Sequence, residues 1–93
     1  MSIVNSKIFG IEDYQKFNKI QAAGHQQHLV NLMISWLKQP NYWGSVFDNR
    51  KGFIEDVSWR NATKDKVSFK QAKAIKAIFL AVVVTPFLKK EKE

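Results

Sequence analysis

A charge-free run near the C-terminus constrains the fold of this chain more than any other feature. Residues 77–88 carry no Asp, Glu, Lys or Arg, and they directly follow residues 60–76, where six of seventeen side chains are cationic. The run is well short of the roughly 20 apolar residues that span a bilayer. We therefore expect residues 77–87 to be core or an oligomer interface, with a membrane-associated helix as the weaker alternative.

The size and composition of the chain indicate one small domain, residues 1–93. Of its 93 residues, 45% are hydrophobic and 13% are aromatic, which is typical of a globular protein. A chain of this length buries only roughly 60–65% of its unfolded surface. Most of the large aromatic side chains are therefore expected to be structural.

Apolar residues in the first half of the sequence recur with helical periodicity in two segments. Residues 12–23 repeat apolar side chains at three-residue spacing, and Gly24 can end that helix in the left-handed conformation. The second predicted helix covers residues 26–39 and stops before Pro40. Its apolar side chains span an arc of about 200°, so we expect it to be the central core helix.

Beyond Pro40 the pattern changes to two aromatic and β-branched runs, residues 42–47 and 53–59, on either side of turn residues 48–52. Such runs around a cluster of turn residues predict a β-hairpin with a five-residue loop. Arg60, at the end of the second run, should point outward. The predicted fold is therefore α+β, with two N-terminal helices, a β-hairpin and a C-terminal helix in one small domain.

The C-terminal helix has the strongest local signals. Ser68 followed three residues later by Gln71 is a capping-box pattern, in which each residue satisfies the other's backbone N–H. Pro86 should end the helix, because its ring clashes with a continuing helix. Three consecutive valines at positions 82–84 lower helix propensity and leave a buried strand as the alternative.

Positive charge accumulates in the second half of the chain. The sequence holds 15 Lys and Arg against 8 Asp and Glu, a net charge of +7, and residues 48–93 carry eleven of these basic and six of these acidic groups. This imbalance favours an anionic partner such as nucleic acid or an acidic protein surface. The alternative is that the charge only keeps a small domain soluble.

The candidate binding residues lie at the predicted hairpin tip and on the approach to the third helix. Lysines beside the exposed amides of a helix N-terminus favour phosphate, and Tyr42 is a candidate for stacking on bases. We expect the hairpin and the third helix to form one electropositive surface. The predicted nucleic-acid or anion-binding residues are Arg50, Lys51, Arg60, Lys64, Lys66, Lys70 and Lys73.

No pattern in the sequence indicates catalysis, a cofactor or a metal site. His25 and His28 could share one side of a metal, but zinc needs three or four ligands and the chain has no cysteine. No nucleophile elbow or glycine-rich phosphate loop is present. The absence of cysteine and of a secretory signal pattern favours a cytoplasmic protein, which we expect not to be an enzyme.

Two hypotheses of function remain. The first is a non-enzymatic basic domain that contacts nucleic-acid phosphates with little sequence preference. The second is a small inhibitor or adaptor, of the kind that mobile elements encode, that binds an acidic or nucleic-acid-binding surface of a larger protein. A homodimer through the apolar C-terminal helix is compatible with both, and steep salt dependence would favour the first.

Overall fold

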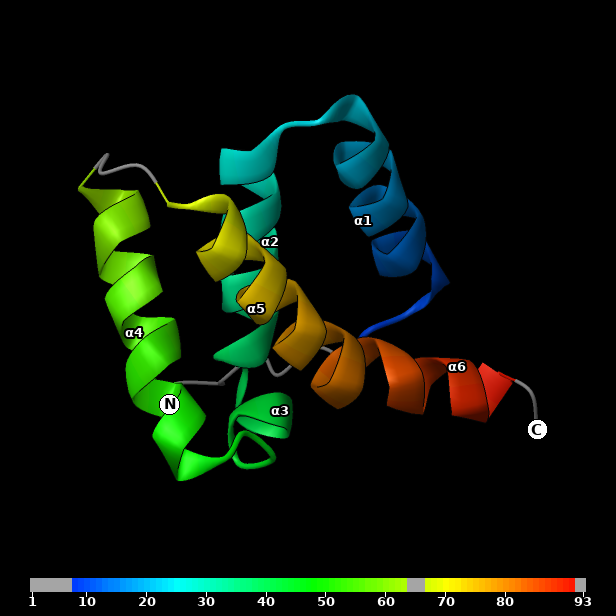
Figure 1. The fold of residues 1–93 in the computed structure, drawn as a ribbon. Helices are drawn as coiled ribbons and strands as arrows, with labels where there is room; N and C mark the ends of the chain where they lie inside the picture. The colour runs from blue at the N-terminus through cyan, green and yellow to red at the C-terminus, as the bar shows by residue number, and fades with distance from the viewer. Residues whose placement is uncertain (1–7, 64–66, 92–93) are drawn as a thin grey trace, which may run out of the picture.

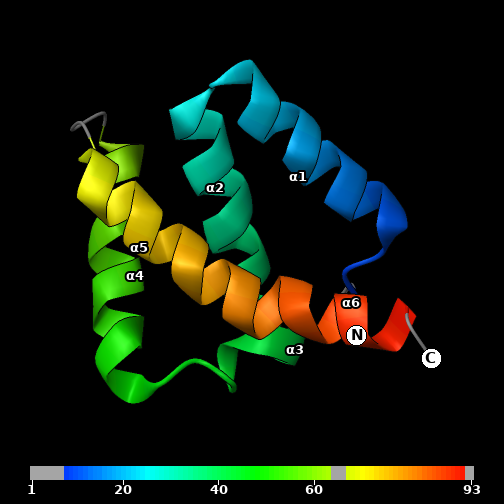
Figure 2. The ribbon, with the colours of Figure 1, turned by 45° about the vertical axis from the view of Figure 1, so that its right-hand side comes forward.

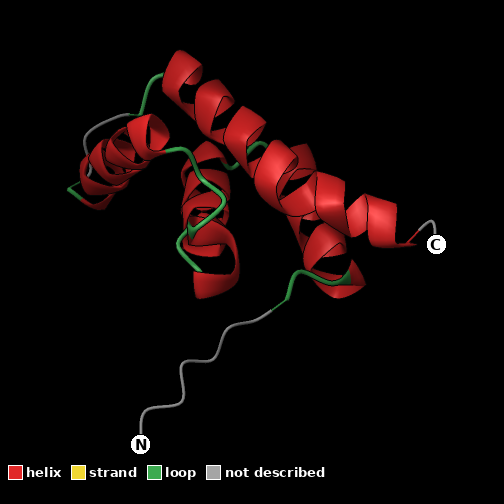
Figure 3. Cartoon of the chain, turned by 90° about the horizontal axis from the view of Figure 1, so that it is seen from below, coloured by secondary structure: helices red, strands yellow, loops and turns green. Residues whose placement is uncertain are grey.

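The computed structural model describes residues 8–63 and 67–91, and every regular element in these two segments is helical (Figures 1 and 3). The elements are α1 (Ile11–Ala23), α2 (Gln26–Leu37), α3 (Pro40–Trp43), α4 (Asp48–Ala62), α5 (Phe69–Phe79), the π-helical η1 (Leu80–Val84) and α6 (Thr85–Glu91).

The predictions of a β-hairpin and of an α+β fold are wrong. The residues predicted to form the turn and the second strand form α4 instead, and the first predicted strand overlaps the short helix α3. The buried residues of α4 are Ile54, Val57 and Asn61, which recur at the three- and four-residue spacing of a helix face. Asp48 in the first turn suits the positive end of the helix dipole.

The two N-terminal helices are confirmed. α1 ends at Ala23, and Gly24 follows with φ 76°, a left-handed conformation that a glycine adopts without the steric cost of a Cβ. The Gly24 N–H donates to the carbonyl of Gln21. This turn reverses the chain, so that α2 starts beside the end of α1 (Figure 2).

α2 is the central helix, as its wide apolar arc predicts. It contacts α1, α3, α4, α5 and η1. Val30, Met33 and Leu37 have no exposed surface. On the α4 side, the amide of the buried Asn61 donates to Oδ1 of the exposed Asn31, and this polar contact joins α2 and α4.

A cluster of aromatic rings surrounds Phe9 in the core. Phe9 is only 2% exposed, and its ring centroid lies 5.2 Å from that of Trp36, 5.7 Å from that of Phe79 and 5.4 Å from that of Phe87. The Phe9 N–H donates to the Tyr42 hydroxyl at 2.8 Å. The irregular segment that contains Phe9 therefore packs against α2, α5 and α6.

The capping box at the start of α5 is confirmed. The Gln71 N–H donates to Ser68 Oγ at 3.1 Å, and the Ser68 N–H donates to Gln71 Oε1 at 3.0 Å. The predicted end of this helix at Pro86 is wrong, because α5, η1 and α6 run on as one helix to Glu91. The Thr85 N–H donates to the Leu80 carbonyl five residues back, and this wider turn accommodates the proline that follows.

The helix Phe69–Glu91 is long and apolar enough to cross a membrane by length and composition, and an 18-residue window within it has a mean hydropathy of 1.6. One such helix is weak evidence, because a core helix of a compact domain passes the same test. Here one side of it lies in the core: Ile75, Phe79 and Val83 are at most 1% exposed.

Candidate functional site

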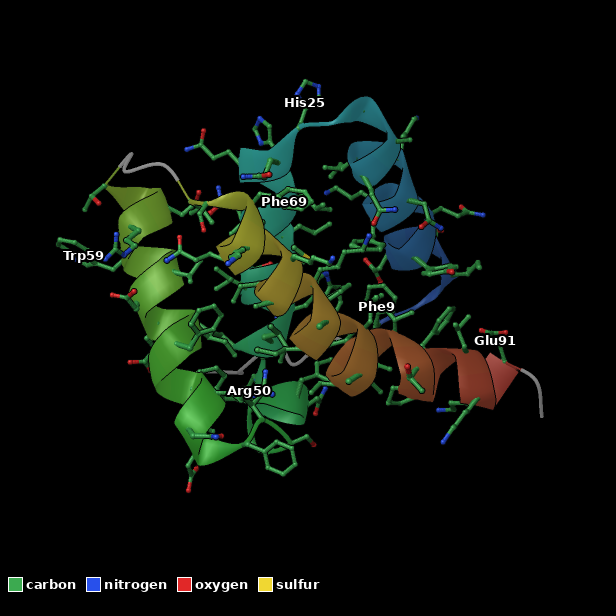
Figure 4. The ribbon with its side chains drawn as sticks, viewed as in Figure 1. Phe9, His25, Arg50, Trp59, Phe69 and Glu91 are labelled. Atoms are coloured by element: carbon green, nitrogen blue, oxygen red, sulfur yellow. The ribbon has the colours of Figure 1, made fainter. Side chains whose placement is uncertain are left out.

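The cations predicted to lie at a hairpin tip are at one end of α4, and Arg60 is at the other. Arg50 is in the first turn and Arg60 in the last, about 15 Å apart along the helix axis. Figure 4 shows Arg50 at the opposite end of α4 from Trp59, the neighbour of Arg60. The structure therefore does not bring Arg50 and Lys51 together with Arg60.

Two of these cations have carboxylate partners on their own helix. Lys51 Nζ lies 3.5 Å from Asp48 Oδ1 and 5.6 Å from the centroid of the Trp43 ring. Arg60 Nε donates to Asp56 Oδ2 at 3.2 Å. These exposed pairs contribute little to stability, but they offset part of the positive charge that a ligand would meet on α4.

The lysines of α5 stand in a different electrostatic setting. Lys70 and Lys73 are exposed and Lys76 is half-buried, and α5 contains no acidic residue. The end of α4 and the start of α5 meet at one corner of the molecule (Figures 1 and 2). Lys64 and Lys66, which were predicted to belong to this group, lie outside the described residues.

A pocket of about 310 Å³ lies between the first half of α5 and the junction of α1 and α2. Its apolar lining comes from α2 and α5, and its polar lining comes from the junction and from two α5 lysines. We call it the α5 pocket. Its lining residues are Gln21, Gly24, His25, Gln26, Leu29, Met33, Phe69, Ala72, Lys73 and Lys76.

Phe69 is the functional candidate that the sequence prediction missed. Its side chain is 72% exposed although it lines the α5 pocket, and Figure 4 shows it at the same end of the molecule as His25. The sequence spacing could have indicated this role, because Lys73 lies four residues after Phe69 and Lys76 lies three residues after Lys73. That spacing places all three on one helix face.

Tyr42, the predicted stacking residue, has a structural role. Its hydroxyl accepts the hydrogen bond from the Phe9 amide, and its ring lies 6.1 Å from that of Trp36. The side chain is half-buried against the core. A base would have to compete with these contacts to stack on Tyr42, whereas Phe69 offers its ring without such competition.

The described residues contain no group of three or more His, Cys, Asp or Glu that could hold a metal ion. His25 and His28 lie with their ring centroids 5.9 Å apart on the exposed start of α2. Comparison of the chain with protein-family models, with curated proteins and with solved structures found no significant match.

Proposed function

We propose that this protein is a non-enzymatic domain that binds nucleic-acid phosphates through the lysines of α5, with little sequence preference. The observation that carries the proposal is the arrangement of Lys70, Lys73 and Lys76 on α5, a helical segment that contains no acidic residue. Ammonium groups displace condensed counterions from a nucleic acid without reading its bases. Such contacts give affinity but little sequence specificity.

The start of α5 also suits an anionic ligand. The positive end of the helix dipole lies there, and lysines in its first turns add charge of a sign that the dipole disfavours. A carboxylate would be the more stabilising residue at these positions, so the lysines are not explained by the stability of the helix. A phosphate beside them would interact favourably with both the dipole and the ammonium groups.

Replacing the three lysines tests the proposal. The variant K70Q/K73Q/K76Q should bind oligonucleotides more weakly, and its log–log salt slope should fall by about 0.7–0.9 for each phosphate that the variant no longer binds. The matched control K38Q/K89Q/K90Q removes the same charge from exposed sites outside α5. Binding is measured by fluorescence anisotropy at several salt concentrations, with circular dichroism as the check on folding.

Two results would count against the proposal. Equal loss of binding in both triple variants would mean that net charge alone attracts the oligonucleotide. No binding by the parent even at low salt would remove nucleic acid as the ligand.

In that second case we would propose the inhibitor or adaptor function instead. The observation that favours it is Phe47, which is 77% exposed beside an apolar groove lined by Ala77, Ile78 and Ala81.

A further inference from the structure

The lining and volume of the α5 pocket suit a small, partly apolar ligand. Leu29, Met33 and Ala72 form its apolar part, and Met33 is fully buried beneath the surface. The volume of about 310 Å³ is at the lower end of the range of small-molecule sites. The Phe69 ring contributes little to the core because it is mostly exposed, so its face is available to a ligand.

The polar groups of the pocket add hydrogen bonding and positive charge. Gln21, Gln26 and His25 line the side formed by the α1–α2 junction, where amide and imidazole groups can both donate and accept. Lys73 and Lys76 line the side formed by α5. None of the ten lining residues is acidic, so the pocket is complementary to an anion.

The position of the polar side is held by a long-range contact. Gln26 Nε2 donates to the carbonyl of Val67 at 3.0 Å, which ties the start of α2 to the segment that leads into α5. Val67 itself packs against the core. The two sides of the pocket are therefore linked at its end, in addition to the packing of α2 against α5.

We infer that the α5 pocket takes one nucleotide of an unpaired strand, with its base against Phe69 and the apolar lining and its phosphate on Lys73 and Lys76. This inference rests on the proposed function and names its substrate class. A base in a duplex is stacked between its neighbours and must be unpaired before it can enter a pocket, whereas a single strand avoids most of this cost. Stacking on an aromatic ring tolerates any base, in keeping with binding that has little sequence preference.

A matched pair of phenylalanine variants tests the inference. F69A should weaken binding of a fluorescent oligothymidine by about 5- to 150-fold, the effect of losing one base–aromatic stack. F47A makes the same change at an exposed ring outside the pocket and should leave binding unchanged. Both variants should bind a duplex of equal length as the parent does.

A second variant fills the pocket without removing the stacking ring. A72L adds bulk to the apolar lining, and leucine is nearly as good a helix former as alanine. It should also weaken binding of the single strand, with unchanged circular dichroism. Equal effects of F69A and F47A, or single-strand binding that both F69A and A72L leave intact, would overturn the inference while the lysine test of the proposed function still stands.

Titration with adenosine monophosphate distinguishes binding of a free nucleotide from binding of a strand. Chemical-shift changes at the Met33 methyl and the Phe69 ring with both oligothymidine and the mononucleotide would support the inference. Changes with the mononucleotide in a parent that bound no oligonucleotide would overturn the assignment to an unpaired strand and leave a free nucleotide as the ligand. If neither oligothymidine nor the mononucleotide perturbs these groups, the inference is wrong.

Discussion

Replacing Phe79 with alanine tests whether the helix Phe69–Glu91 is a core helix. The Phe79 ring has no exposed surface, and its centroid lies 5.0 Å from that of Phe17 and 5.7 Å from that of Phe9. Truncating such a ring costs about 3–5 kcal/mol, because transfer energy is lost and a cavity remains. A domain of this length has a total stability of about 5–14 kcal/mol, so the F79A variant should lose a large part of it.

The matched control is F69A, the same substitution on the same continuous helix at a ring that is 72% exposed. It should change the free energy of unfolding by no more than about 0.5 kcal/mol. Urea unfolding followed by circular dichroism measures both variants. With a slope of about 1–3 kcal/mol/M, F79A should lower the unfolding midpoint by roughly 1 M or more, and F69A should barely move it.

Equal midpoints for F79A and F69A would refute the assignment of this segment to the core. If the parent also sedimented with lipid vesicles, the membrane-associated helix would become the better interpretation. Should F79A fail to fold, the milder I75V substitution at another fully buried position is informative, with an expected cost of about 0.5–1.5 kcal/mol.

Two glycine substitutions test the corrected fold by thermal unfolding. G52A should stabilise the protein by about 0.8–1 kcal/mol, because Gly52 lies inside α4 and an added Cβ meets nothing within 4 Å; destabilisation would instead fit a glycine in a hairpin turn. G24A should destabilise by about 1–2 kcal/mol, because Gly24 has φ 76°. G44A is its control, since Gly44 has φ −66° and open space around it, and a loss as large as that of G24A would contradict the argument.

The sequence alone was sufficient for the elements that local signals specify. The capping box of Ser68 and Gln71 and the left-handed Gly24 act within one turn of the chain, so neighbouring residues determine them. The wide apolar arc of α2 likewise required burial on several sides, which made its central position predictable.

Residues 48–62 show where local patterns were insufficient. The alternation over residues 53–59 resembles a strand with Phe53, Val57 and Trp59 on one buried face, but Trp59 is 65% exposed. A helical spacing of Ile54, Val57 and Asn61 was present in the same residues. Tertiary packing decided between the two periods, because only a helix buries this set together against α2 and brings Asn61 to Asn31.

The sequence by itself determined that lysines share the first turns of α5, since helical spacing and the Ser68 cap are local. It could not determine that the α1–α2 junction lies opposite those lysines, because that depends on contacts such as Gln26 with Val67, 41 residues apart. Nor could it show that Phe69 is left exposed while Phe79 is buried on the same helix. Exposure depends on which other helices cover each face, and only the tertiary structure decides that.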